Sequence, residues 1–151
     1  MLKITKSTWL RNMAAKLSIL IDLNIILDVL QNREPFYEDS AQMLAGIETG
    51  LITGYLAAHS VTTLFYLIQK DQSASAASAA ITELLQFLKI APINQNTIDQ
   101  ALNLDYRDFE DAVQMICALQ CKADYLITRN LSDYQPPLVP VLKPVEFLAA
   151  L

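Results

Sequence analysis

The sequence contains very little cysteine, glycine or histidine. Among its 151 residues there are two cysteines, three glycines and one histidine. Cys117 and Cys121 lie four positions apart on one predicted helix, so they point the same way and do not form the CxxC pair of a metal site. We therefore expect both thiols to be free and largely buried, which is typical of a protein in a reducing compartment.

Basic residues are also scarce. Eleven lysines and arginines stand against sixteen aspartates and glutamates, which gives a net charge of −5 and an isoelectric point of about 4.7. This balance argues against a protein that holds nucleic acid by bulk electrostatic attraction, although it leaves local basic patches open.

The sequence also lacks a long hydrophobic run. Its most apolar stretch, residues 17–30, is interrupted by Asp22 and Asp28 and is too short to span a bilayer. The segment before it has no signal-peptide core. We therefore expect a cytoplasmic protein without membrane contacts.

The length favours one domain, which we place at residues 17–151. Residues 1–16 differ from the rest because they carry four basic residues, no acidic residue and only scattered apolar side chains. We interpret this segment as an N-terminal extension.

Apolar runs and helical periodicities alternate along the domain. Short runs predict strands at residues 17–21, 54–59, 89–93, 125–128 and 138–144. Between them, the spacing of apolar residues and capping side chains predicts helices at residues 23–32, 37–50, 60–70, 73–88, 94–102 and 108–122, with a closing helical turn at 145–151. This alternation predicts an α/β fold with a parallel sheet covered on both faces.

Acidic side chains follow the predicted strands on one side of this sheet. Asp22 closes the first strand, Asp111 lies in the first turn of the helix that Asp108 caps, and Asn130 and Asp133 follow the strand at 125–128. The carboxyl ends of parallel strands share one edge, where ligands bind in open sheets. Carboxylates gathered there need a cation or protons, and oxygen ligands select Mg²⁺ or Mn²⁺.

Each of these acids also has a simpler interpretation. Asp22 and Asp108 can serve only as helix caps, Glu110 and Asp111 complement a helix dipole, and Asp133 can be a turn residue. Caps alone, however, do not require three acids near one rim.

Three segments combine these motifs, namely LIDLNIILDVLQNREPFYEDS, DFEDAVQMICALQCKADYLITRN followed by LSDY, and PVLKPVEFL. Together they resemble the PIN domain, in the branch akin to VapC-type toxins. The resemblance implies a three-layer α/β/α sandwich with a mostly parallel sheet of four to five strands. It also implies a ribonuclease that depends on Mg²⁺ or Mn²⁺ and is a possible toxin of a toxin–antitoxin pair, with an antitoxin as partner. Asp22, Asp111 and Asp133 match the acidic positions of the family, with Asn130 beside them.

One position departs from that pattern. Many PIN domains carry a glutamate in the helix after the second strand, whereas the nearest equivalent here is Tyr66. Asp108 or Glu110 can replace it as a metal ligand. The departure leaves open a second function, a catalytically weak PIN-like module that binds RNA or a protein.

Other polar and aromatic residues give weaker signals. Arg33 and Arg129, and beside them Lys70 and Arg107, are candidates to hold substrate phosphates, and a solvated surface role is equally open. We expect His59, Trp9, Tyr55 and Tyr66 to be structural. Lys143 with Pro144 resembles the end of a receiver domain, but the adjacent acid pair of that fold is missing after the first strand.

The region between Phe36 and Lys70 carries many apolar side chains. Two successive helices there present more apolar surface than one sheet face can cover, which predicts a homodimer.

Overall fold

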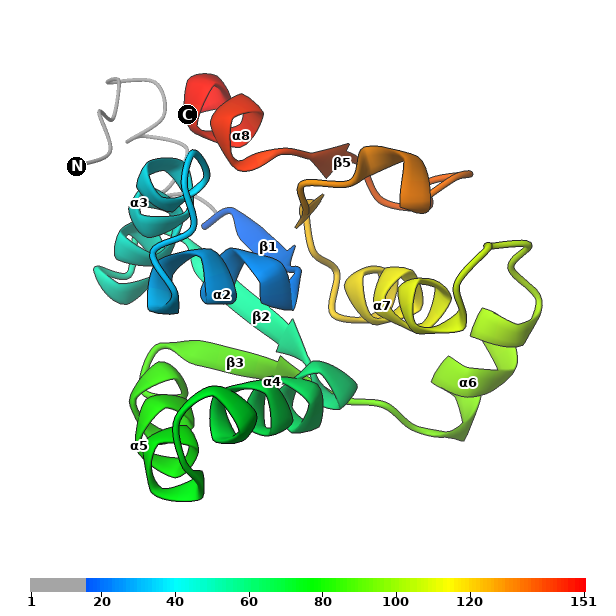
Figure 1. Ribbon diagram of the computed structural model, residues 1–151. Coiled ribbons are helices and arrows are strands. Elements are labelled where there is room, and N and C mark those ends of the chain that lie inside the picture. Colours follow the sequence, from blue (N-terminus) through cyan, green and yellow to red (C-terminus); the bar gives the residue numbers. More distant parts are fainter. Residues whose placement is uncertain (1–15) are drawn as a thin grey trace.

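A five-stranded parallel sheet forms the centre of the molecule, as shown by a computed structural model that describes residues 16–151. Its strands are β1 (Ser18–Ile21), β2 (Thr53–Ala57), β3 (Leu88–Ala91), β4 (Tyr125–Ile127) and β5 (Val141–Leu142), in the order β3-β2-β1-β4-β5 (Figure 1). Every neighbouring pair is parallel, and Ile19 of β1 lies opposite Gly54 of β2 and Tyr125 of β4.

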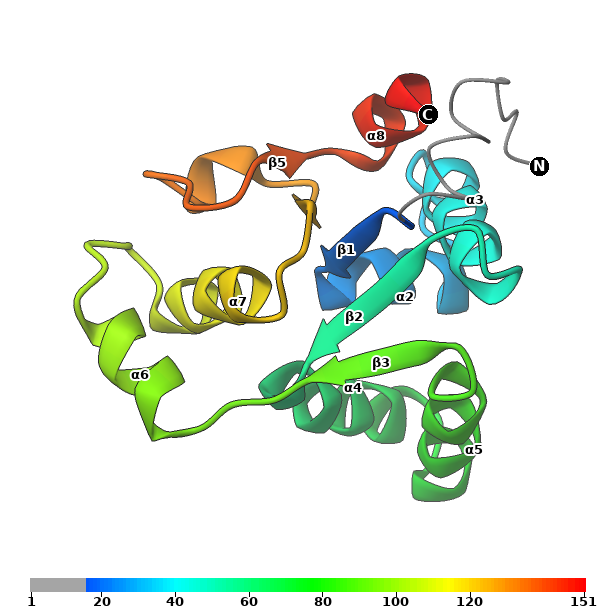
Figure 2. The same ribbon diagram turned by 180° about the vertical axis from the view of Figure 1, so that it is seen from behind.

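Helices cover both faces of this sheet. In the described part of the chain they are α2 (Leu23–Leu30), α3 (Tyr37–Glu48), α4 (Ala58–Asp71), α5 (Ala74–Leu84), α6 (Gln95–Leu102), α7 (Phe109–Gln120) and α8 (Pro144–Ala150). A short 3-10 helix, η1 (Leu131–Asp133), follows β4. Helices α6 and α7 lie on one side of the sheet and α2, α3, α4, α5 and α8 on the other (Figures 1 and 2).

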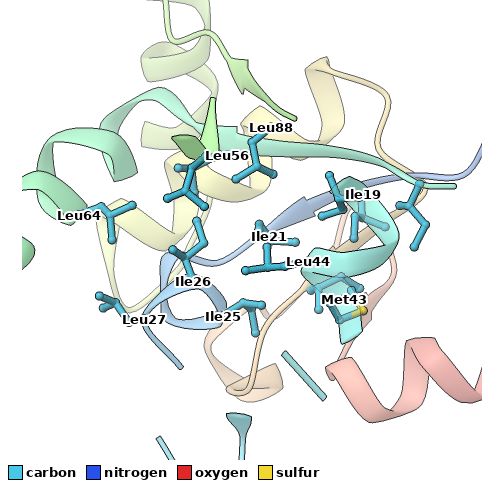
Figure 3. Packing of buried hydrophobic residues seen from close by; sticks show 14 of the residues in the cluster. Ile19, Ile21, Ile25, Ile26, Leu27, Met43, Leu44, Leu56, Leu64 and Leu88 are labelled. Carbon is cyan, nitrogen blue, oxygen red and sulfur yellow. The ribbon is translucent and has the colours of Figure 1, made fainter. Parts of the chain in front are cut away.

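The two sides of β1 belong to two separate hydrophobic clusters. Ile19 and Ile21 point into the cluster with α2, α3 and α4, where Met43 and Leu64 are among its members (Figure 3). Leu20 points the other way, into the cluster with α7. All three strand residues are fully buried, as expected for a central parallel strand. These findings confirm the predicted three-layer α/β/α fold with a parallel sheet of four to five strands.

Several predicted boundaries are wrong. The helix predicted to start at Ser60 begins two residues earlier: α4 starts at Ala58 after the extended residue Ala57, and Ser60 is a buried residue inside the helix. Helix α5 ends at Leu84, and Leu88 starts β3 because its side chain packs into the core. Of the predicted strand at 138–144 only the two residues of β5 pair with the sheet, and Pro144 already begins α8.

The structure confirms the predicted caps of three helices. Asp22 caps α2, Asp108 caps α7 and Asn94 caps α6, where the predicted helix at 94–102 begins. Cys117 and Cys121 are free thiols, as predicted.

Much of the apolar surface that predicted a homodimer packs within the chain. Met43, Leu44 and Ile47 of α3 are buried, as are Leu64 and Ile68 of α4. The homodimer therefore stays a prediction with a weaker basis. No helix of residues 16–151 is long and apolar enough to cross a membrane. The predicted extension at residues 1–16, including Trp9, lies outside the described residues apart from Lys16.

Candidate functional site

A polar cavity of about 150 Å³ lies where β1 and β4 end and α7 begins. The predicted site residues that line it are Asp22, Glu110, Asp111, Asn130 and Asp133. Four polar residues that the sequence did not single out for a site also line it, namely Asn24, His59, Ser60 and Gln114. Asp108, Arg33 and Arg129 do not line this cavity. The structure thus brings together side chains from positions 22 to 133 of the chain.

Asp22 is fixed by the strand that precedes it and by the strand beside it. Its backbone N–H donates to the carbonyl of Ile127 at 2.9 Å. One carboxylate oxygen accepts from the N–H of Asn24 at 3.3 Å, and the other accepts from the hydroxyl of Thr128 at 3.0 Å. Burial raises the pKa of Asp22, and these two hydrogen bonds oppose that rise.

Asp111 faces the same cavity from the first turn of α7. Its own N–H donates to the carboxylate of the cap Asp108 at 3.1 Å. The phenol of Tyr134 donates to its side-chain Oδ1 at 3.2 Å. Burial, followed by the negative charges of Asp108, Asp133 and Asp22, raises the pKa of Asp111 to about 6. Mutual repulsion of this kind is the reason why clustered carboxylates attract cations.

A chain of buried hydrogen bonds supports Asp111 from behind. The amide of Gln114 donates to the Tyr134 hydroxyl at 2.8 Å, and the hydroxyl of Ser60 donates to the Gln114 carbonyl oxygen at 3.4 Å. This chain joins α4, α7 and the segment after η1. All three side chains are buried, so the polar groups satisfy one another away from water.

Asn130 and Asp133 reach the cavity on the segment after β4. The Thr128 hydroxyl, which donates to Asp22, also accepts from the N–H of Asn130 at 3.2 Å. Asp133 ends η1 and is exposed to solvent. One threonine therefore links the end of β4 to the end of β1.

The position expected to carry a further acid does not contribute to the cavity. Tyr66 is 59% exposed on α4, and the polar side chains that α4 places at the cavity are His59 and Ser60. Burial lowers the pKa of His59. Of the two suggested replacements, Glu110 lines the cavity and Asp108 is engaged as the helix cap.

The chemistry of the cavity suits a hard divalent cation. It offers carboxylate and amide oxygens, and the pKa values of Asp22 and Asp111 are raised. Within residues 16–151, however, no three histidine, cysteine or acidic side chains are already close enough together to hold an ion. To bind a metal ion there, the carboxylates that line the cavity would have to move closer together.

The two arginines predicted to bind substrate have partners within the chain. Arg33 donates to Gln31 at 2.9 Å and to Asn24 at 3.4 Å. Arg129 forms an ion pair with Asp28 at 3.2 Å, and its guanidinium carbon lies 4.0 Å from the ring centre of Phe36. Asp28 is fully buried and also accepts from the hydroxyl of Ser40 at 3.0 Å.

One of the site residues that the sequence did not single out could have been recognised from its neighbours. Gln114 is a polar residue between the apolar Val113 and Met115, on a helix whose seven central positions are all buried. Such a residue needs a buried hydrogen-bond partner. Thr128 and Tyr134 were inside or beside the motifs, but nothing in the sequence indicated which acid each one contacts.

Comparison with known proteins agrees with this architecture. A sequence profile described as the PIN domain matches residues 18–132. No curated protein sequence matches the chain.

Among solved structures, a toxin–antitoxin complex from Klebsiella pneumoniae is similar with a TM-score of 0.65 and 20% identity, over 83% of this chain and 97% of that chain. VapBC-1 from nontypeable Haemophilus influenzae is similar with a TM-score of 0.64 and 16% identity, over 85% of this chain and 99% of that chain. VapC20 from Mycobacterium tuberculosis, a sarcin–ricin loop cleaving toxin, is similar with a TM-score of 0.58 and 14% identity, over 72% of this chain and 86% of that chain. At these identities the likeness shows a shared fold. Because the profile spans most of the 151 residues, the chain belongs to the PIN domain family.

Proposed function

We propose that this protein is a metal-dependent ribonuclease that hydrolyses RNA phosphodiesters. The observation that carries the proposal is the single cavity that Asp22, Asp111 and Asp133 share, although they are far apart in the sequence. Membership of the PIN domain family supports it, and so does the likeness to VapC20, which is described as cleaving the sarcin–ricin loop.

The proposed roles follow from the contacts of each residue. Asp22, Asp111 and Asp133 would hold Mg²⁺ or Mn²⁺, with Glu110 as a further oxygen donor at the cavity wall. When bound, such an ion lowers the pKa of water and neutralises the charge of a phosphate. Thr128 and Tyr134 hold the carboxylates of Asp22 and Asp111 in place, and Asn130 offers an amide to the substrate. Asp108 keeps Asp111 at the start of its helix.

A second candidate is a PIN-like module that binds RNA or protein and cuts poorly. It is favoured by the exposed Tyr66 at the position of an expected acid. The lack of a preassembled trio of ligands within residues 16–151 points the same way.

Cleavage assays with purified protein test the first candidate against the second. We expect the protein to cut RNA when Mg²⁺ or Mn²⁺ is present and to stop when a chelator is added. Asp22→Asn should lower the rate by about 100-fold or more, because ligand loss removes several kcal/mol of charge stabilisation. The exposed Asp99 on α6 provides the control, since Asp99→Asn should cut normally. Cutting by Asp22→Asn at the normal rate would contradict the assignment, and absence of calorimetric heat with millimolar Mn²⁺ would favour the binding module.

Metal binding should weaken as the pH falls. The pKa of Asp111 is about 6, so roughly nine-tenths of this carboxyl is ionised at pH 7 and one-tenth at pH 5. A metal ion must displace the proton, and we therefore expect an apparent Kd for Mn²⁺ about tenfold weaker at pH 5 than at pH 7. Isothermal titration at the two pH values measures this. Equal affinities would show that Asp111 is not a ligand.

The biological setting is proposed from the structural neighbours. Several of these are described as toxin–antitoxin or VapBC structures, and we propose that this chain is the toxin of such a pair, bound by an antitoxin. We further propose that it acts in the cytoplasm and forms a homodimer.

A further inference from the structure

A larger cavity of about 320 Å³ lies at the same edge of the sheet, beside the ends of β4 and β5. It is bordered by the start of α3 and the start of α8, two helices that pack against each other (Figure 1). The side chains that matter here are Phe36, Asp39, Arg129, Lys143 and Val145. None of them belongs to the acidic cavity described above.

This cavity, which we call the α3–α8 cavity, has the features of a site for a flat, polar ring. Its volume is at the lower end of the range of roughly 300–1,000 Å³ for small-molecule pockets. Phe36 is 39% exposed as a residue, and the guanidinium carbon of Arg129 lies 4.0 Å from the centre of its ring. Aromatic rings and guanidinium planes are the surfaces on which unstacked RNA bases stack.

The charges around the α3–α8 cavity have separate roles. Arg129 already pairs with the buried Asp28, so the cation available to a phosphate is the exposed Lys143. Asp39 places a carboxylate in the wall of the cavity. A carboxylate accepts hydrogen bonds and donates none, so it selects a base whose edge carries donors. Guanine offers two neighbouring donors, N1–H and N2–H, whereas uracil offers one.

Residues that are adjacent in the sequence border the α3–α8 cavity and the acidic cavity. Arg129 lies between Thr128, whose hydroxyl donates to Asp22, and Asn130, which lines the acidic cavity. Adjacent residues of the chain thus border the two cavities, so the nucleotide next to a phosphate at the carboxylates is the candidate to meet Phe36 and Lys143.

We propose that the α3–α8 cavity binds one guanine nucleotide of single-stranded RNA next to the phosphate that is cut. This inference rests on the proposed ribonuclease function and adds a base preference to it. Phe36 and Arg129 provide the stacking surface, Asp39 reads the donor edge of the base, and Lys143 contacts a phosphate.

The test is an NMR titration of the full chain, in chelator, with 5′-GMP, 5′-UMP and inorganic phosphate. We expect 5′-GMP to shift the backbone amides around residues 36–39 and 143–146 and to bind about tenfold more tightly than 5′-UMP, because a hydrogen bond to a charged group discriminates by about that factor. Equal affinity for the two nucleotides, or the same shifts with phosphate alone, would overturn the proposal.

Four variants sharpen the result. Val145→Trp fills the α3–α8 cavity from an exposed position of α8 and should abolish binding of both nucleotides. Asp39→Asn should remove the preference for guanine, and Lys143→Gln should weaken both nucleotides equally. Lys89→Gln, an exposed lysine on the far edge strand β3, is the matched control and should bind like the unmodified protein. Normal binding by Val145→Trp, with the rest of its spectrum unchanged, would place the nucleotide elsewhere.

The two proposals fail separately. The Asp111→Asn variant should bind 5′-GMP normally, because residue 111 does not line the α3–α8 cavity. If the protein binds 5′-GMP there but cuts no RNA with any divalent ion, the nucleotide site stands and the ribonuclease falls. If the protein cuts RNA but 5′-GMP leaves the α3–α8 cavity unchanged, the ribonuclease stands and the nucleotide site falls.

Discussion

Asp111→Asn is expected to lower the rate of RNA cutting by about 100-fold or more and, at the same time, to stabilise the metal-free protein. Asparagine keeps an oxygen that can accept from Tyr134, so the buried chain through Gln114 stays satisfied. What the substitution removes is a negative charge that burial and the charges of Asp108, Asp133 and Asp22 disfavour.

The size of this stability change depends on pH. The pKa of Asp111 rises from 3.8 to about 6 on folding, so the folded protein holds a proton that the unfolded chain releases between these values. The contribution of this carboxyl is therefore most favourable below about pH 4 and is lost as the pH rises through 6. At pH 8 we expect the variant to gain about 1–2 kcal/mol, less than the full shift implies because Asp111 is partly exposed and favours the start of its helix.

Urea denaturation in chelator at pH 4 and pH 8 measures the effect. The unfolding free energies of the variant and the unmodified protein should nearly coincide at pH 4 and separate at pH 8. Asp99→Asn, at an exposed position of α6, should show no such separation. A variant that is less stable at pH 8 would show that Asp111 is held by favourable contacts that outweigh the repulsion.

Arg129→Leu should destabilise the fold by about 3 kcal/mol, because it leaves the buried carboxylate of Asp28 without its cation. The side chain of Asp28 is fully buried and that of Arg129 is 23% exposed, so water cannot replace the lost partner at the carboxylate. The hydroxyl of Ser40 remains as a single hydrogen-bond donor. Arg107→Leu, at an exposed arginine, should change stability by less than about 0.5 kcal/mol.

A second substitution separates charge from packing. Adding Asp28→Asn to Arg129→Leu removes the isolated charge and should restore more than half of the lost stability in urea denaturation at pH 8. The loss in Arg129→Leu alone should also shrink at low pH, because burial already raises the pKa of Asp28 and the carboxyl can take up a proton. Additive effects of the two substitutions would show that the pair is not coupled.

The sequence predicted the layers of the fold because parallel strands leave a strong local pattern. Ile19 to Ile21 is an uninterrupted apolar run, and in the structure these residues of β1 are buried on both faces of the sheet. Asp22 and Asp108 were recognisable as caps because a cap needs only its own neighbours. For the same reason the start of α4 was missed, since Ala57 offers no side chain to mark it.

The hydrogen bonds that hold the site aspartates could not be predicted from the sequence, because they join residues that are far apart along the chain. Thr128 lies 106 positions from Asp22, and Gln114 lies 54 positions from Ser60. The sequence marks Arg129 only as a candidate for substrate phosphates, whereas in the structure its guanidinium pairs with Asp28. A buried aspartate within the apolar residues 25–29 was the available sign that a cation had to come from elsewhere in the chain.

The pairing of β1 with β4 also has a consequence for how the protein is made. The first strand lies next to one that begins at Tyr125, so its hydrogen bonds on that side cannot form until most of the chain has left the ribosome. Contacts this far apart in sequence form late and slowly. Asp133, which follows β4, can join Asp22 and Asp111 only after that strand has been made, and a nascent chain therefore has no complete acidic cavity during most of its translation.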